Sequence, residues 1–226
     1  MRCGTTSLHR YLATHPGIFM AKWPKEGAYE VNYFNNWWNR GCKIKKYRSL
    51  FPPVERGLCR GEKSPCYATR PEYMLRLRRE VGDNVKIILI LRNPIHRTYS
   101  GLAQSTNHSG KKGAPLDLYD EDACNATWTI SNAFYDIHLQ NVRNILPNSP
   151  LLVLYYEDYV KDNQAVLNRI TEFLGVRRHD FEIRPYKKRE KPPTHMYREL
   201  SDLFRPSVAR LYAALGDQQI LDWGII

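Results

Sequence analysis

The chain has 226 residues, of which 42% are hydrophobic and 25% are charged, a composition typical of one globular domain with an ample core. No apolar run approaches the length of a membrane span, and no signal-peptide pattern opens the sequence. The net charge of +11 favours anionic partners such as nucleotides, nucleic acids, anionic glycans or membrane surfaces.

Near its start the sequence contains Arg2 and the run Gly4-Thr5-Thr6-Ser7. Apolar residues at helical spacing follow this run. This pattern predicts a tight turn and an amphipathic helix that ends near His15-Pro16-Gly17. A glycine lets backbone N–H groups approach an anion, and the hydroxyls that follow can bind it. A Walker A loop carries its lysine after the glycines, whereas here the cation precedes Gly4. The alternative is a capped helix start that binds no ligand.

A short strand is predicted over Ile18–Ala21, and Lys25 and Glu26 follow it. Glu26 is either half of a surface ion pair with Lys25 or a carboxylate that removes a proton at the end of a strand. An aromatic stretch runs from Tyr29 to Trp38. These residues alone do not choose between the two roles of Glu26.

The five cysteines are Cys3, Cys42, Cys59, Cys66 and Cys124. No pair has the spacing of a metal site, so we expect no metal. Cys42 could pair with Cys59 or with Cys66, and the sequence leaves the pairing open. Two glycosylation sequons, at Asn107 and Asn125, favour an oxidising secretory lumen together with the cysteines.

Gly61-Glu62-Lys63-Ser64-Pro65 predicts a loop that packs polar groups closely together. Pro71 then fits the first turn of a basic helix from Glu72 to Val81. Neither segment identifies a function by itself.

The continuous apolar run Ile87–Leu91 predicts a strand buried on both faces, as in a parallel sheet. Pro94 opens a helix that places Arg97 and Ser100 within one turn of each other. Because ligands bind at the carboxyl ends of strands in open α/β sheets, Arg92 and this helix would suit a phosphate. The alternative is an ordinary surface turn.

The second half continues the alternation of helices and strands. The expected elements are a surface excursion over 107–127, a helix over 131–146, a buried strand over Leu151–Tyr155, a helix over 159–174 that ends at Gly175, and one or two closing helices through Leu215. Basic residues gather in two clusters, one from Lys43 to Arg48 and one from Arg177 to Lys191. Each cluster is either a solvated face or a contact surface for an anion.

Four segments taken together resemble the Golgi carbohydrate sulfotransferases, most closely the heparan and chondroitin sulfate branch. They are Arg2 to Leu8, Lys25-Glu26, Gly61 to Pro65, and Arg92 to Ser100. The resemblance covers nearly the whole chain and depends on the order and spacing of these motifs. It implies an α/β fold with a parallel β-sheet flanked by helices and a P-loop-like phosphosulfate site. It also implies a single domain over 1–226, with the first strand and any membrane anchor lying upstream of the sequence.

The resemblance implies 3′-phosphoadenosine 5′-phosphosulfate (PAPS) as the donor, adenosine 3′,5′-bisphosphate (PAP) as the product, and no metal. The catalytic residues that it implies are Glu26, Lys63 and Arg2. The donor-binding residues are Arg2, Cys3, Gly4, Thr5, Thr6 and Ser7 at the 5′-phosphosulfate, Arg92 and Ser100 at the 3′-phosphate, and Arg189 and Lys191 in a late closing loop.

Sulfuryl transfer needs positive charge near the departing phosphate oxygen and one base for the proton of the acceptor. Arg2 stands where the glycan-specific branch carries lysine. Because a guanidinium cannot act as a general acid, protonation of the leaving group would fall to Lys63.

We therefore expect transfer to a hydroxyl or amine of a glycan, an anionic glycosaminoglycan-like polysaccharide, with no nucleic-acid partner and membrane contact only through an upstream anchor. Three alternatives stay open: a protein-tyrosine or small-molecule acceptor, which Arg2 favours; a P-loop kinase or NTPase; and a non-catalytic protein that binds polyanions. The expected location is the Golgi lumen for a eukaryotic protein and the cytoplasm for a bacterial one.

Overall fold

The computed structural model describes residues 2–23, 29–51, 53, 58–108, 124–184 and 191–226. The chain divides into two compact units. Unit 1 comprises Met1–Cys3, Leu91–Gln140 and Lys187–Ile226, and unit 2 comprises Gly4–Ile90 and Asn141–Tyr186. The expectation of a single domain over 1–226 stays a prediction.

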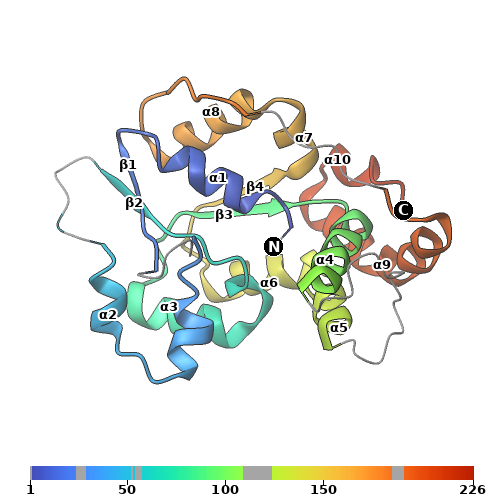
Figure 1. Ribbon diagram of the computed structural model, residues 1–226, viewed down its shortest axis with the longest axis horizontal. Coiled ribbons are helices and arrows are strands. Elements are labelled where there is room, and N and C mark those ends of the chain that lie inside the picture. Colours follow the sequence, from blue (N-terminus) through green and yellow to red (C-terminus); the bar gives the residue numbers. More distant parts are fainter. Residues whose placement is uncertain (1, 24–28, 52, 54–57, 109–123, 185–190) are drawn as a thin grey trace. The chain divides into compact units, whose positions relative to one another are not determined.

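Unit 2 contains the strands and the helices that pack on them (Figure 1). Its elements are α1 (Thr5–Leu12), β1 (Ile18–Met20), the π-helical turn η1 (Tyr33–Trp37), α2 (Ile44–Arg48), β2 (Cys59–Gly61), the 3₁₀ turn η2 (Tyr67–Thr69), α3 (Pro71–Val81), β3 (Ile87–Leu91, whose last residue lies in unit 1), β4 (Leu151–Tyr155), α7 (Tyr156–Lys161) and α8 (Asn163–Leu174). β1 and β2 pair in parallel, with Ile18 opposite Cys59, and β3 pairs with β4. The expected α/β class is confirmed.

The alternation of side chains along β3 and β4 creates two apolar layers in unit 2. Ile88, Ile90 and Leu154 face a cluster that includes Leu8 of α1 and Leu167 of α8. Ile87, Leu89 and Leu151 face a second cluster, formed by residues such as Phe34, Tyr47 and Met74. Figure 1 shows α1 and α8 on one side of this strand pair and α3 on the other.

Unit 1 is helical over its described residues beyond the end of β3. Its elements are α4 (Pro94–His108), α5 (Cys124–Ser131), α6 (Tyr135–Ile145, whose last turn lies in unit 2), α9 (Thr194–Leu215) and α10 (Gln218–Leu221). The Asp136 carboxylate at the start of α6 pairs with Arg210 on α9 at 2.7 Å and accepts a hydrogen bond from Ser207. This buried carboxylate fixes α6 against α9.

Three expectations about the elements need correction. The helix expected over 131–146 begins at Tyr135, because Ser131 ends α5 and Asn132 to Phe134 form a turn. The helix expected over 159–174 is two helices, because the backbone of Asp162 is extended and interrupts the helix. The Asp162 side chain then caps α8 by accepting a hydrogen bond from the Ala165 N–H. Within β3, residues 87–90 are half-buried rather than fully buried, since the described strands pair only two by two.

The pairings of Cys42 with Cys59 or with Cys66, which the sequence leaves open, are not formed in the structure, where Cys42 and Cys59 are thiols. Burial raises the pKa of the Cys59 thiol, although the nearby Lys86 lowers it in part. Among the described residues, no helix has both the length and the apolar character needed to cross a membrane. Most of the surface excursion expected over 107–127, including Ser109, the third residue of the sequon at Asn107, lies outside the described residues.

Gly101 marks the closest approach of α4 to α5. A Cβ atom placed there would lie 2.5 Å from Cγ2 of the buried Thr129. Gly101→Ala should lower the free energy of unfolding by about 1 kcal/mol, because overpacking of roughly 1–3 kcal/mol exceeds a helix-propensity gain of about 1 kcal/mol. Thr129→Ser removes Cγ2, so the double variant should regain the loss in urea unfolding. Equal stability of the Gly101→Ala protein and the wild type would show that α5 moves aside freely.

Candidate active site

The first turn of α1 presents backbone N–H groups and hydroxyls at the start of unit 2. Gly4 is the residue before α1, and its φ of 82° lies in the left-handed region that favours glycine. A side chain at this position would also meet the rings of Tyr156 and Tyr159 at 3.2 Å. No side chain caps the N-terminus of α1, so its first-turn N–H groups suit an anion. The predicted turn and helix are confirmed.

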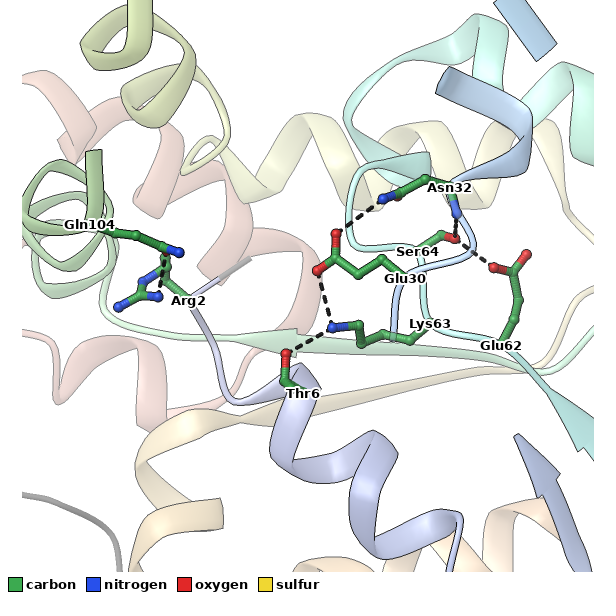
Figure 2. Close-up of polar contacts among 8 residues, drawn as sticks. All are labelled: Arg2, Thr6, Glu30, Asn32, Glu62, Lys63, Ser64 and Gln104. Atoms are coloured by element: carbon green, nitrogen blue, oxygen red, sulfur yellow. Dashed lines mark hydrogen bonds and ion pairs between the residues drawn. The ribbon is translucent and has the colours of Figure 1, made fainter. Parts of the chain in front are cut away.

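Lys63 is 8% exposed and lies just beyond the end of β2. Its Nζ donates to Thr6 Oγ1 at 2.8 Å and pairs with Glu30 Oε1 at 3.1 Å (Figure 2). A buried ammonium group is stable only with such partners. The structure thus brings Lys63, predicted as catalytic, to Thr6, predicted as donor-binding. We call Thr6, Glu30 and Lys63 the Lys63 cluster.

Glu30 is a site residue that the sequence analysis missed. Asn32 donates from its side-chain amide to Glu30 Oε2 at 3.1 Å, so both carboxylate oxygens are engaged. Asn32 adopts a left-handed φ of 49°, which is uncommon outside glycine and turns the chain after Glu30. The sequence feature that could have indicated Glu30 is its place two residues before Asn32, near the start of the aromatic stretch from Tyr29 to Trp38. The Lys25-Glu26 pair, on which the prediction fell, lies outside the described residues.

A histidine beside the Lys63 cluster is neutral. His9 on α1 is buried, packs its ring edge-to-face on Tyr29 at 5.4 Å, and has no recorded hydrogen-bond partner within the described chain. Burial, with help from the charges of Lys63, Lys22 and Arg10, lowers its pKa to about 4. It therefore adds no further positive charge next to Lys63 at neutral pH.

A second cluster forms in unit 1 around Arg2, and we call Arg2, Arg92, Ser100 and Gln104 the arginine cluster. Arg2 donates to Ser100 Oγ from Nε at 3.1 Å and from Nη2 at 3.0 Å, and its Nη1 donates to Gln104 Oε1 at 2.6 Å. The buried Arg92 donates from Nη1 to the Arg2 carbonyl oxygen at 2.9 Å. Figure 2 shows Arg2 and Gln104 side by side. Guanidinium groups and a hydroxyl in this arrangement suit a phosphate.

The predicted residues Arg2, Arg92 and Ser100 therefore do converge, each within unit 1. Gln104, one helical turn after Ser100, is a member that the sequence analysis missed, although its i, i+4 spacing signals it. Arg2 has a left-handed φ of 64°, a strained conformation for a residue with a side chain, and such strain is typical of functional sites. The buried Arg97 donates to the Thr129 carbonyl oxygen and so holds α5.

The remaining predicted residues have mixed outcomes. Cys3 is buried in unit 1, with its Sγ 3.7 Å from the Tyr135 hydroxyl, and its role in donor binding stays a prediction. Ser7 on α1 lies 3.4 Å from the Tyr159 hydroxyl. Lys191 is exposed. Burial is the main cause that lowers the pKa of His96, and the charges of Arg92 and Lys191 add to it. Arg189 lies outside the described residues.

No group of acidic, histidine or cysteine side chains among the described residues has the arrangement of a metal site. The two clusters lie in different units but are adjacent in sequence, since Arg2 precedes Gly4 by two residues. Each holds cationic donors and hydroxyls, the groups that bind phosphate and sulfate oxygens. Each cluster by itself therefore suits an anionic group.

Glu62, next to Lys63, is a second carboxylate in unit 2 that the motif contains but that received no role. It accepts hydrogen bonds from Ser64 Oγ at 2.5 Å and from the Tyr47 hydroxyl at 3.2 Å. Burial raises its pKa from 4.5 to about 7, and the hydrogen bonds from Ser64, Tyr67 and Tyr47 offset that rise only in part. Glu62 therefore titrates near neutral pH.

This raised pKa predicts how stability depends on pH. Between pH 4.5 and 7 the folded protein binds more protons than the unfolded chain, so the free energy of unfolding falls as the pH rises. The contribution of Glu62 amounts to about 3 kcal/mol over this range. Glu62→Gln should remove it, so the difference in stability between variant and wild type should change across this range in urea unfolding. Parallel pH profiles for the two proteins would contradict the assignment.

Comparison with known proteins identifies the family of the chain. The sulfotransferase domain family matches residues 1–191. The chain is 26% identical over 181 residues to mouse heparan sulfate glucosamine 3-O-sulfotransferase 6, covering 77% of this chain and 50% of that protein. It is 25% identical over 187 residues to human bifunctional heparan sulfate N-deacetylase/N-sulfotransferase 2, covering 77% of this chain and 21% of that protein. The chain thus spans half or less of these relatives.

Two solved structures share the fold. The sulfotransferase from Alicyclobacillus acidocaldarius superposes with a TM-score of 0.77 at 24% identity, over 98% of this chain and 94% of that one. The sulfotransferase domain from the curacin biosynthetic pathway superposes with a TM-score of 0.54 at 20% identity, over 86% and 78%. Because the family match covers most of the sequence, the chain belongs to the sulfotransferase domain family, which implies PAPS as its sulfuryl donor.

Proposed function

We propose that this protein transfers a sulfuryl group from PAPS to a hydroxyl or amine of an anionic, glycosaminoglycan-like glycan. The observation that carries the proposal is the Lys63 cluster, in which a buried ammonium contacts a helix-start hydroxyl and a carboxylate. Cation, donor-loop hydroxyl and candidate base are the three groups that the reaction needs next to one another.

Each anionic group of the donor has candidate partners within one unit. The first-turn N–H groups of α1, the Thr6 hydroxyl and Lys63 suit the 5′-phosphosulfate. Arg92, Ser100 and the Arg2 side chain suit the 3′-phosphate, with Lys191 and the undescribed Arg189 as residues of a closing loop.

In the transfer step, the bond between sulfur and the bridging phosphate oxygen breaks while a bond forms between sulfur and the acceptor atom. The acceptor proton goes to a carboxylate, and PAP departs. Lys63 stabilises the charge that develops on the departing phosphate oxygen. We propose Glu30 as the base, because its carboxylate is the one that contacts Lys63 within the described residues. Glu26 remains the competing candidate.

The charge of the protein supports an anionic acceptor. The net charge is +11, and the cluster from Lys43 to Arg48 on and before α2 exposes Lys43, Lys45, Lys46 and Arg48. The matched relatives carry names that specify heparan sulfate as their substrate. A tyrosine or small-molecule acceptor is the second candidate, because Arg2 stands where the glycan-specific branch carries lysine.

Transfer of ³⁵S from labelled PAPS to desulfated heparin and to a tyrosine peptide tests this proposal. Wild type should label the glycan. Glu30→Gln should reduce turnover by about 10²–10⁴-fold, the usual contribution of a general base, while calorimetric binding of PAP stays near normal. Glu26→Gln is the matched control and should keep most of the activity.

The opposite ranking of the two variants would assign the base to Glu26. Labelling of the peptide with none on the glycan would favour the second candidate. A folded wild-type protein that binds heparin but transfers no label would support the non-catalytic alternative.

A further inference from the structure

The Glu62 carboxylate is the common acceptor for hydroxyl groups that come from three places in unit 2. Tyr47 lies on α2, Tyr67 on η2, and Ser64 in the loop after β2. Within the described residues, these three hydroxyls are the titratable and polar groups that hydrogen-bond to Glu62 from the elements packed on it. A carboxylate accepts hydrogen bonds on both oxygens and donates none, so it can serve several hydroxyls at once.

Two of these hydroxyls also bind the backbone just after Glu30. The Asn32 N–H donates to Ser64 Oγ at 2.8 Å. The Tyr33 and Phe34 N–H groups donate to the Tyr67 hydroxyl oxygen at 2.8 and 3.3 Å. A hydroxyl that accepts from an amide still has one proton to donate, and that proton needs an acceptor. Glu62 supplies the acceptor, so it sets the orientation of both hydroxyls.

The Glu30 segment has one more tie to the same loop, since the Val31 N–H donates to the Lys63 carbonyl oxygen at 3.1 Å. Residues 31–34 are therefore anchored by consecutive backbone N–H groups to Lys63, Ser64 and Tyr67. Asn32 in turn holds the Glu30 carboxylate through its side chain at 3.1 Å. Figure 2 shows the path from Glu62 through Ser64 and Asn32 to Glu30 and Lys63.

We propose that Glu62 is a positioning residue, which holds the Glu30 carboxylate opposite Lys63 through the hydroxyls of Ser64 and Tyr67. The inference rests on the proposed role of Glu30 in sulfuryl transfer. Burial of the Glu62 carboxylate is unfavourable by itself, as its raised pKa shows. The carboxylate accepts hydrogen bonds on two oxygens, whereas a neutral amide accepts on one, and this second acceptor is what Glu62 contributes.

Protonation of Glu62 should loosen the segment. Below a pH of about 7 one carboxyl oxygen becomes a donor, and the hydroxyl that donated to it loses its acceptor. Turnover should therefore fall as the pH drops through about 7, although the fold becomes more stable over the same range. A residue that only stabilised the fold would change activity and stability in the same direction.

Tyr67→Phe and Tyr47→Phe form a matched pair for the test, because each deletes one hydroxyl that contacts Glu62. The Tyr67 hydroxyl also binds the Glu30 segment, whereas within the described part of the chain the Tyr47 hydroxyl donates to Glu62 and to no other group. Tyr67→Phe should lower kcat for transfer from PAPS to desulfated heparin by about 10- to 100-fold, a cost typical of misplaced catalytic groups, with KM for PAPS little changed. Tyr47→Phe should stay within a few-fold of wild type.

Combination with Glu30→Gln separates this inference from the proposed function. If Tyr67 acts through Glu30, adding Tyr67→Phe to Glu30→Gln should cause no further loss. Two results would overturn the positioning role and leave the proposed base intact, provided that Glu30→Gln itself is inactive. One is that the losses in kcat multiply in the double variant. The other is that Tyr67→Phe and Tyr47→Phe lower kcat equally. An active Glu30→Gln protein would overturn the proposed base, and this inference with it.

Hydrogen exchange provides a readout that does not need activity. In Tyr67→Phe the amides of Tyr33 and Phe34 should exchange faster than in Tyr47→Phe, and in Ser64→Ala the amide of Asn32 should do so. Unchanged exchange at these amides in folded variants would contradict the proposal. Ser64→Ala also keeps the kinetic test available if Tyr67→Phe does not fold.

Discussion

The buried ammonium of Lys63 is the constraint on which the candidate site depends. A cation that is 8% exposed must find oxygen partners within the protein, and here they come from α1 and from the segment before η1. This requirement joins three parts of the sequence that are far apart, at residues 6, 30 and 63. The same contacts place a candidate base and a donor-loop hydroxyl beside the group that stabilises a departing phosphate oxygen.

The guanidinium groups of the arginine cluster are likewise held by oxygen partners, here within unit 1. Arg2 adopts a left-handed backbone conformation, its guanidinium lies against Ser100 and Gln104 of α4, and Arg92 holds its carbonyl oxygen. Gly101 lets α4 lie close to α5, where the buried Arg97 secures the contact. The helix that carries Ser100 is thus fixed by packing, and the side chains of the cluster are presented by rigid elements.

Local sequence patterns predicted most of the elements and all members of the two clusters except Glu30 and Gln104. The apolar runs of β3 and β4, Pro71 at the start of α3 and Gly175 after α8 all carry signals within a few residues. The helix breaks at Asn132 and Asp162 were missed, because apolar spacing continues across them. Glu30 was missed because its role depends on its contact with Lys63 and on the contacts that Asn32 and Tyr33 make with Ser64 and Tyr67, whereas the Lys25-Glu26 pair is visible in the sequence itself. Side-chain contacts over such separations follow from the folded chain.

Calorimetric titration of the wild-type protein with PAP, 5′-AMP and ATP with Mg²⁺ tests the central claim, that the arginine cluster binds the 3′-phosphate of the donor nucleotide. PAP differs from 5′-AMP by the 3′-phosphate alone, for which the arginine cluster supplies guanidinium and hydroxyl groups. We predict that PAP binds at least about tenfold more tightly than 5′-AMP, a difference of about 1.4 kcal/mol, and more tightly than ATP. Equal affinity for PAP and 5′-AMP, or tighter binding of ATP with Mg²⁺, would contradict the account.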